Sequence, residues 1–235
     1  MTQKNYDVVV IGGGVIGILT AFFLTKAGIK VGLIEKGVIA SGTSSKTMSN
    51  LSLHNRMPGP EWDLAMETLK IYKIIDETMG KLFEFEVTAS LMLIDLEEKI
   101  SWAQERVKEQ QQAGLDIEYI DTKNLRELDP SVSHDISGAA YCQSSARINS
   151  LLLCNNLARE AKSLGTEIYT NTAVTGILVK KGKVIGIKNT SGIINCEIVV
   201  NAAGPSADLI GKMVGINLPI KKNRGHILVT QQIPT

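Results

Sequence analysis

Residues 7–17 read DVVVIGGGVIG, and residues 30–36 read KVGLIEK. The first stretch opens with an apolar, mostly β-branched run, which is typical of a parallel strand buried on both faces. A glycine-rich turn follows, then an apolar stretch, then a second strand-like run that ends in an acidic residue. This order of strand, glycine turn, helix, strand and acid predicts a βαβ unit that binds a dinucleotide.

Each position in the turn has a physical reason. Gly12 permits the tight turn, Gly14 lets the backbone approach a pyrophosphate because it has no Cβ, and Gly17 lets the helix lie close to the strand. The helix is expected to begin with Val15 and Ile16. The N-terminus of a helix offers free N–H groups and the positive end of the helix dipole. These residues are therefore predicted to hold the phosphates.

The acid and the loop after it extend the predicted site. Glu35, followed by Lys36, ends the second strand, where a carboxylate can accept hydrogen bonds from ribose hydroxyls and would repel a 2′-phosphate. Residues 37–50 are rich in Gly, Ser and Thr. They either form a plain flexible loop or wrap the pyrophosphate with small hydroxyl residues and backbone N–H groups.

Composition narrows the class of protein. The chain has 235 residues, 44% of them hydrophobic, and a net charge of +1, so no general attraction to nucleic acid is expected. Residues 8–25 are uncharged and long enough to resemble a membrane span, but they contain four glycines, so no stable membrane insertion and no signal peptide are expected. The three cysteines form no CxxC pair and the three histidines no metal-binding pattern, which predicts a cytoplasmic protein without a metal site.

Periodicity predicts alternating helices and strands along the rest of the chain. Helices are expected at 61–79, 96–113, 122–128 and 150–164. Strands are expected at 91–94, 138–142, 167–170, 174–179, 184–188, 193–200 and 224–230. The runs 174–179 and 184–188 predict a hairpin with Gly182 in its turn.

Several motifs occur in one order: GGGVIG with its acid, SGTSS at 41–45, the helix from 150, TAV at 172–174, VVNAAG at 199–204 and RGHILVT at 224–230. Together they resemble the D-amino-acid oxidase superfamily of FAD-dependent oxidoreductases, and within it the group of glycine oxidase, sarcosine oxidase and D-amino-acid dehydrogenase. The resemblance runs over essentially the whole chain and implies FAD as the cofactor. It implies these FAD-binding residues: Gly12, Gly14, Val15, Ile16, Gly17, Glu35, Lys36, Thr43, Ser44, Ser45, Val174, Ala203 and Gly204.

The resemblance also implies an α/β fold with two interleaved domains. A Rossmann-like FAD-binding domain is expected from residues 1–50 and 146–215, and part of an α+β substrate domain from 51–145 and 216–235. Relatives continue into a C-terminal portion that carries the rest of the substrate domain and the usual carboxylate-binding arginine. The expectation is therefore a C-terminally truncated chain, whose substrate domain that portion or a partner subunit would complete.

The implied reaction is oxidation of the C–N bond of a small amino acid or secondary amine, with oxygen or another acceptor taking the electrons. His54 and Arg224 are the catalytic candidates; the alternatives are a plain loop histidine for His54 and a core or structural role for Arg224. Ser49, Asn50, Arg56 and His226 are further candidates near the ring or the substrate. A glycerol-3-phosphate or 2-hydroxyacid dehydrogenase, and a split subunit without activity of its own, remain alternatives.

Overall fold

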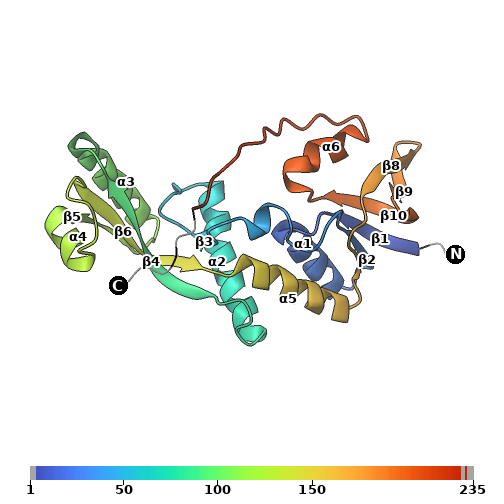
Figure 1. Cartoon of the computed structure of the whole chain (residues 1–235), viewed down its shortest axis with the longest axis horizontal. Helices are drawn as coiled ribbons and strands as arrows, with labels where there is room; N and C mark the ends of the chain where they lie inside the picture. Colours follow the sequence, from blue (N-terminus) through green and yellow to red (C-terminus); the bar gives the residue numbers. More distant parts are fainter. Residues whose placement is uncertain (1–3, 229–230, 232–235) are drawn as a thin grey trace. The chain divides into compact units, whose positions relative to one another are not determined.

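The computed structural model of the chain describes residues 4–228 and 231 (Figure 1). The described residues fall into two compact units: unit 1 comprises the ranges up to Met48 and from Ser150 onward, and unit 2 comprises Ser49–Asn149. The boundaries between the two units differ slightly from the expected domain boundaries, because residues 49–50 and 146–149 lie in unit 2. The described residues after 216 group with unit 1, and their place in a substrate domain stays a prediction.

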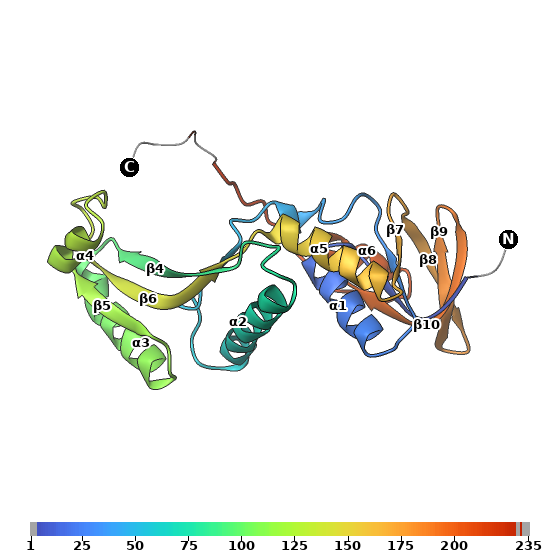
Figure 2. The same cartoon turned by 90° about the horizontal axis from the view of Figure 1, so that it is seen from below.

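Unit 1 is built on a six-stranded sheet with the order β7-β2-β1-β10-β9-β8. The pairs β7–β2, β2–β1 and β1–β10 are parallel, whereas β10, β9 and β8 form an antiparallel meander. Helices α1 and α5 lie side by side in this unit (Figure 2). The bounds are β1 Lys4–Ile11, α1 Val15–Lys26, β2 Val31–Ile34, α5 Ser150–Ser163, β7 Glu167–Tyr169, β8 Val174–Lys180, β9 Lys183–Asn189, β10 Gly192–Asn201 and α6 Ala207–Lys212.

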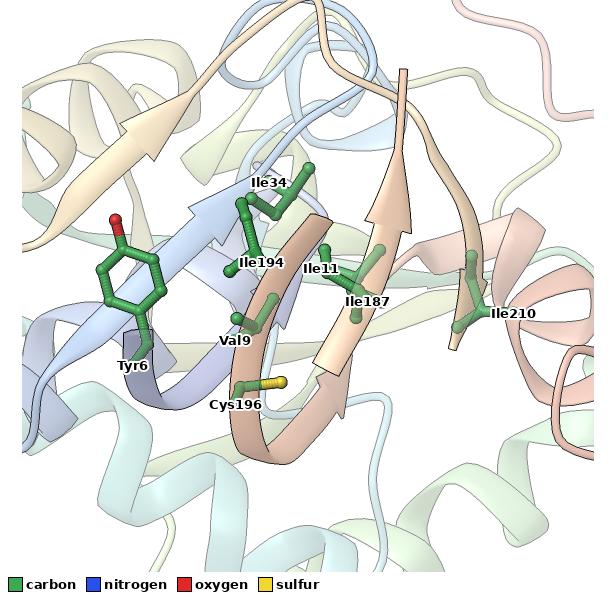
Figure 3. Close-up of a cluster of buried hydrophobic side chains, with 8 residues drawn as sticks. All are labelled: Tyr6, Val9, Ile11, Ile34, Ile187, Ile194, Cys196 and Ile210. Carbon is green, nitrogen blue, oxygen red and sulfur yellow. The ribbon is translucent and has the colours of Figure 1, made fainter. Parts of the chain in front are cut away.

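The centre of this sheet is apolar on both faces, as the unbroken β-branched run of the sequence predicts. Val8 to Ile11 of β1 and all four residues of β2 are buried. Figure 3 shows one cluster of buried side chains in which residues of β1 meet residues of β2, β9, β10 and α6. The expected hairpin is confirmed, since β8 and β9 pair antiparallel and both Lys181 and Gly182 of its turn have positive φ.

Unit 2 is a smaller sheet of order β3-β6-β4, with β5 pairing on β6, and three helices. Its main core surrounds Trp62 of α2 and includes Leu53 from the segment between β3 and α2. The bounds are β3 Asn50–Leu51, α2 Pro60–Thr78, β4 Glu86–Ile94, α3 Ile100–Gln112, β5 Ile117–Asp121, α4 Thr122–Leu128 and β6 Gly138–Arg147.

The expected strand at 224–230 is wrong for its described part, because residues 224–228 form neither helix nor strand. Residues 229–230 lie outside the described residues. Conversely, the strands β3 and β5 and the short helix α6 were not expected from the pattern. Within the described ranges, none of the helices has both the length and the apolarity needed to cross a bilayer.

Candidate dinucleotide-binding site

The glycine turn is held by close backbone packing against the end of β10. Gly12 has φ +115°, and a Cβ on it would lie 2.3 Å from the carbonyl oxygen of Ala202. The N–H of Ala202 in turn donates to the carbonyl of Ile11 at 2.9 Å. The structure therefore brings Ala203 beside the first turn, with Gly204 directly after it, and their contact with a cofactor stays a prediction.

The N-terminus of α1 faces the hydroxyl-rich loop. Gly14 is the residue before the helix, and a Cβ on it would meet only one atom within 4 Å, the Oγ of Ser44 at 3.0 Å. The N–H of Val15 donates to that same Oγ at 3.0 Å. Ile16 follows with a 66% exposed side chain. The N–H of Val15, the first residue of the helix, is thus capped by a small hydroxyl from the loop.

The hydroxyl-rich loop is held by a hydrogen bond from the start of α5. Thr43, Ser44 and Ser45 form a short 3₁₀ helix, and the hydroxyl of Ser150, at the start of α5, donates to the carbonyl of Ser44 at 2.7 Å. From the sequence, Ser150 is simply a helix start; its bond to Ser44 needs the two segments to meet in space. The structure thereby adds Ser150 as a residue that supports the candidate site.

Glu35 closes the turn on its other side. Its Oε2 accepts from the N–H of Gly13 and its Oε1 from the N–H of Gly37, each at 2.7 Å. Lys36, the next residue, is exposed. A carboxylate oxygen has more than one lone pair, so both oxygens can still accept a hydrogen bond from a ribose hydroxyl.

The segment before β8 is tied to the same acid. The N–H of Glu35 donates to the carbonyl of Tyr169 at 2.8 Å, and the N–H of Thr172 donates to the carbonyl of Glu35 at 2.9 Å. These two hydrogen bonds hold the segment that leads to Val174, the half-buried first residue of β8. The carboxyl ends of β1, β2 and β10 thus present glycine backbone, a helix N-terminus and a carboxylate at one edge of the sheet.

These residues fit an adenine dinucleotide. The space at Gly14 into which a Cβ would project suits a pyrophosphate, and the adjoining N–H groups and helix dipole favour its negative charge. Glu35, at the end of β2 directly beside β1, supplies the acceptor that ribose hydroxyls need. FAD carries both groups, so its adenosine diphosphate half matches this edge of unit 1.

The catalytic candidates come from both units: His54 from unit 2, and Arg224 and His226 from unit 1. His54, in unit 2, is 6% exposed, and its Nδ1 lies 2.8 Å from the Oγ of Ser90. Burial, and then the charge of Arg106, lower the pKa of His54, so a neutral ring is favoured. Arg224 and His226 are exposed and lie outside any helix or strand. A structural role is the simpler reading for His54, and a catalytic role for any of the three stays a prediction.

The cysteines in the described part of the chain are buried thiols. Cys142, Cys154 and Cys196 are buried and unpaired, and burial raises the pKa of the Cys154 and Cys196 thiols to about 11. Such thiols stay protonated at neutral pH and are poor nucleophiles. Within residues 4–228 and 231, no three His, Cys, Asp or Glu side chains group as a metal site would require.

Comparison with known proteins gives the family. The model of the DAO family, described as FAD dependent oxidoreductase, matches residues 7–235. The chain is 29% identical over 273 residues to the hydrogen cyanide synthase subunit HcnC of Pseudomonas protegens, covering 98% of this chain and 66% of that protein. It is 28% identical over 226 residues to the glycine oxidase of Bacillus subtilis, covering 93% of this chain and 60% of that protein.

A solved structure agrees with these relatives. The glycine oxidase of Bacillus cereus superimposes with a TM-score of 0.81 at 29% identity, over 88% of this chain and 57% of that one. The chain therefore spans between about half and two thirds of the lengths of the proteins it matches. On the match over residues 7–235, the chain belongs to the DAO family of FAD-dependent oxidoreductases.

Proposed function

We propose that this protein oxidises the C–N bond of a small amino acid or secondary amine with FAD as the cofactor. The observation that carries the proposal is the single sheet edge at which Gly14, the N-terminus of α1 and Glu35 converge. The likeness to two glycine oxidases, one of them a solved structure, supports an amino acid as the substrate class. FAD, when bound, supplies a flavin N5 that accepts a hydride from the carbon bearing the amine.

In this proposal the residues of this chain bind the cofactor and orient it. The N-terminus of α1, at Gly14, Val15 and Ile16, binds the pyrophosphate, in part through the Ser44 hydroxyl to which the Val15 N–H donates, and Gly12 and Gly17 keep the turn close to the helix. Glu35 accepts from the ribose, with Lys36 beside it. The backbone of Val174 meets the adenine edge, and the remaining contacts come from Thr43, Ser44, Ser45, Ala203 and Gly204.

A subunit role is compatible with the same site. The name of the Pseudomonas protegens relative calls that protein a subunit. By analogy, this chain could hold FAD while a partner subunit completes the substrate site. Oxygen or another electron acceptor would then reoxidise the cofactor.

The test is anaerobic reduction of the FAD-loaded chain. Glycine, sarcosine, D-alanine and proline are added in turn, with glycerol 3-phosphate and lactate as hydroxyl-bearing comparators. Loss of the oxidised-flavin absorbance with an amine but not with either comparator supports the proposal. Bleaching by glycerol 3-phosphate or lactate alone would contradict it and favour a hydroxyl-oxidising enzyme.

A further inference from the structure

Side chains link two strands of unit 1 that are not neighbours. In the order β7-β2-β1, strand β2 separates β1 from β7. The hydroxyl of Tyr6 on β1 nevertheless lies 2.5 Å from the hydroxyl of Tyr169 on β7, and the two rings meet edge to face with their centroids 6.4 Å apart. Lys4 of β1 also forms an ion pair with Glu167 of β7. The candidate dinucleotide-binding site uses none of these four side chains.

Gly32, the second residue of β2, leaves the room for this link. A Cβ on it would lie 2.9 Å from Cδ2 and 3.0 Å from Cε2 of the Tyr6 ring. These distances are too short for carbon–carbon contacts, so a side chain at this position would push the ring away. Tyr6 is 5% exposed and lies at one side of the core cluster in Figure 3. The ring therefore crosses β2 and reaches β7 because residue 32 has no side chain.

The hydrogen bonds of the link run in one direction. The hydroxyl of Tyr169 donates to Oε2 of Glu167 at 3.0 Å, so the proton between the two phenols comes from Tyr6. Burial, and then the bond to Tyr169, raise the pKa of Tyr6, whereas the hydrogen bond from Lys4 lowers the pKa of Glu167. Tyr6 therefore stays a donor and Glu167 an acceptor at neutral pH. The ion pair is about half-exposed and weak by itself, so the partly buried phenol pair is the firmer part of the link.

The link holds a short edge strand that supports Glu35. β7 has three residues and, among the described strands, pairs with β2 alone. At its end the carbonyl of Tyr169 accepts from the N–H of Glu35 at 2.8 Å, and two residues later the N–H of Asn171 donates to the carbonyl of Gly37 at 2.8 Å. The backbone on both sides of the Glu35 carboxylate is thus bonded to β7 and its extension. A shift of β7 would move that carboxylate.

We propose that Tyr6 is a positioning residue for the cofactor. Its hydroxyl, which passes over Gly32 to Tyr169, fixes β7 and so holds Glu35 where a ribose hydroxyl of FAD can donate to it. The proposal rests on the proposed function only in taking FAD as the ligand of Glu35. Substrate oxidation plays no part in it, so the two proposals can fail separately.

The experiment titrates the full chain with FAD and with its 2′,3′-dideoxyadenosine analogue, which lacks both hydroxyls of that ribose, and follows flavin fluorescence. Wild type should bind FAD about tenfold or more tightly than the analogue, because the analogue loses a hydrogen bond to a charged group. Tyr6→Phe, which keeps the ring over Gly32, should weaken FAD at least about threefold and leave the analogue unchanged. The preference for FAD should then fall to about threefold or less.

Tyr169→Phe should lower the preference in the same way, because it removes the other hydroxyl of the pair and keeps the backbone carbonyl that Glu35 uses. The double variant should be no weaker than either single variant, since both substitutions break one bond. Gly32→Ala should act in the same direction by displacing the ring.

Ile187→Val is the matched control. Ile187 is fully buried in the same core cluster, but it lies on β9, away from β7. The substitution should destabilise unit 1 and leave the preference for FAD unchanged. Folded Tyr6→Phe and Tyr169→Phe chains with the wild-type preference would overturn the proposal, as would an equal fall in Ile187→Val.

A folded wild-type chain that binds FAD no more tightly than the analogue, or binds neither, would also overturn the proposal. A chain that shows the expected preferences, but whose flavin no amine reduces, would count against the proposed function and not against the role of Tyr6.

Discussion

Glu35 shows how one side chain organises the candidate site. Its two oxygens each accept a backbone N–H at 2.7 Å, one from the turn before α1 and one from the loop after β2. Such charge-assisted bonds are among the stronger ones in proteins. The carboxylate is therefore fixed by the protein itself, and a ribose would meet an acceptor that is already oriented.

His54 is the residue of unit 2 whose environment has the clearest consequence for stability. Its ring is buried beside Ser90, and the Oγ of Ser90 lies 2.6 Å from that of Ser145. Its carbonyl accepts from Arg106 at 3.1 Å. Because burial and Arg106 lower its pKa from the ordinary 6.5, the unfolded chain takes up this proton at a higher pH than the folded chain.

We therefore predict that unit 2 loses stability as the pH falls below about 6.5, down to the lowered pKa of the folded state, by up to roughly 1.4 kcal/mol per pH unit. His54→Asn, which keeps a side-chain amide within reach of Ser90, should remove this contribution. Urea unfolding at pH 7.5 and 5.5, followed by tryptophan fluorescence, measures it. His134→Asn is the control, since His134 is exposed. Equal pH dependence in wild type and His54→Asn would contradict the prediction.

At the scale of elements, the contact between α1 and the turn that precedes it is the tightest feature of unit 1. A Cβ on Gly17 would lie 1.9 Å from the carbonyl oxygen of Gly12. The Cα of Gly17 and the carbonyl of Gly12 cannot move apart without displacing the helix or the strand. The close packing of helix on turn, expected from the spacing of the glycines, is thus observed.

We predict that Gly17→Ala destabilises unit 1 by roughly 1–3 kcal/mol, because the added methyl group must push α1 away from β1. Urea unfolding followed by circular dichroism measures the change. Gly176→Ala is the control: its Cβ would lie 3.9 Å from the nearest atoms, those of Lys188. A Gly17→Ala chain as stable as Gly176→Ala would show that the helix relaxes at no cost.

The elements also show why sequence reasoning succeeds in one place and fails in another. The βαβ unit and α2 were predictable because their apolar periodicity is long and their ends carry glycine or proline. At 224–230 the pattern has strand propensity, but a strand needs a partner, and residues 224–228 pair with no described strand. The short helix α6 contains Gly211 and follows Pro205 closely, so its local signal was weak.

The residues of the candidate site also differ in how well the sequence predicts their positions. Gly12, Gly14, Gly17 and Glu35 could be placed from spacing alone, because the βαβ geometry brings them together over a short stretch of chain. The bond from Ser150 to Ser44 could not be placed in this way, and neither could the bonds that Nε2 of Gln110 donates to the carbonyls of His54 and Arg56. Each of these bonds joins residues more than 50 positions apart. Contacts of that kind depend on how whole elements pack.

At the scale of the whole molecule, each unit has its own core. In unit 1 it is the cluster around β1 and β10, and in unit 2 the cluster around Trp62. Both tryptophans of the chain, Trp62 and Trp102, lie in unit 2. Fluorescence therefore reports unit 2, whereas flavin absorbance reports the site proposed in unit 1. The two signals allow ligand binding and folding to be followed separately in one sample.

The central claim is that the turn of unit 1 binds the FAD pyrophosphate, and flavin content after gel filtration tests it most directly. The wild-type chain and Gly225→Val, which adds a side chain where nothing lies within 4 Å, should both retain flavin absorbance. Gly14→Val should retain none, with unchanged circular dichroism, because its side chain would occupy the space beside Ser44. A Gly14→Val chain with the flavin content of wild type, or a folded wild-type chain that retains no flavin, would contradict the claim.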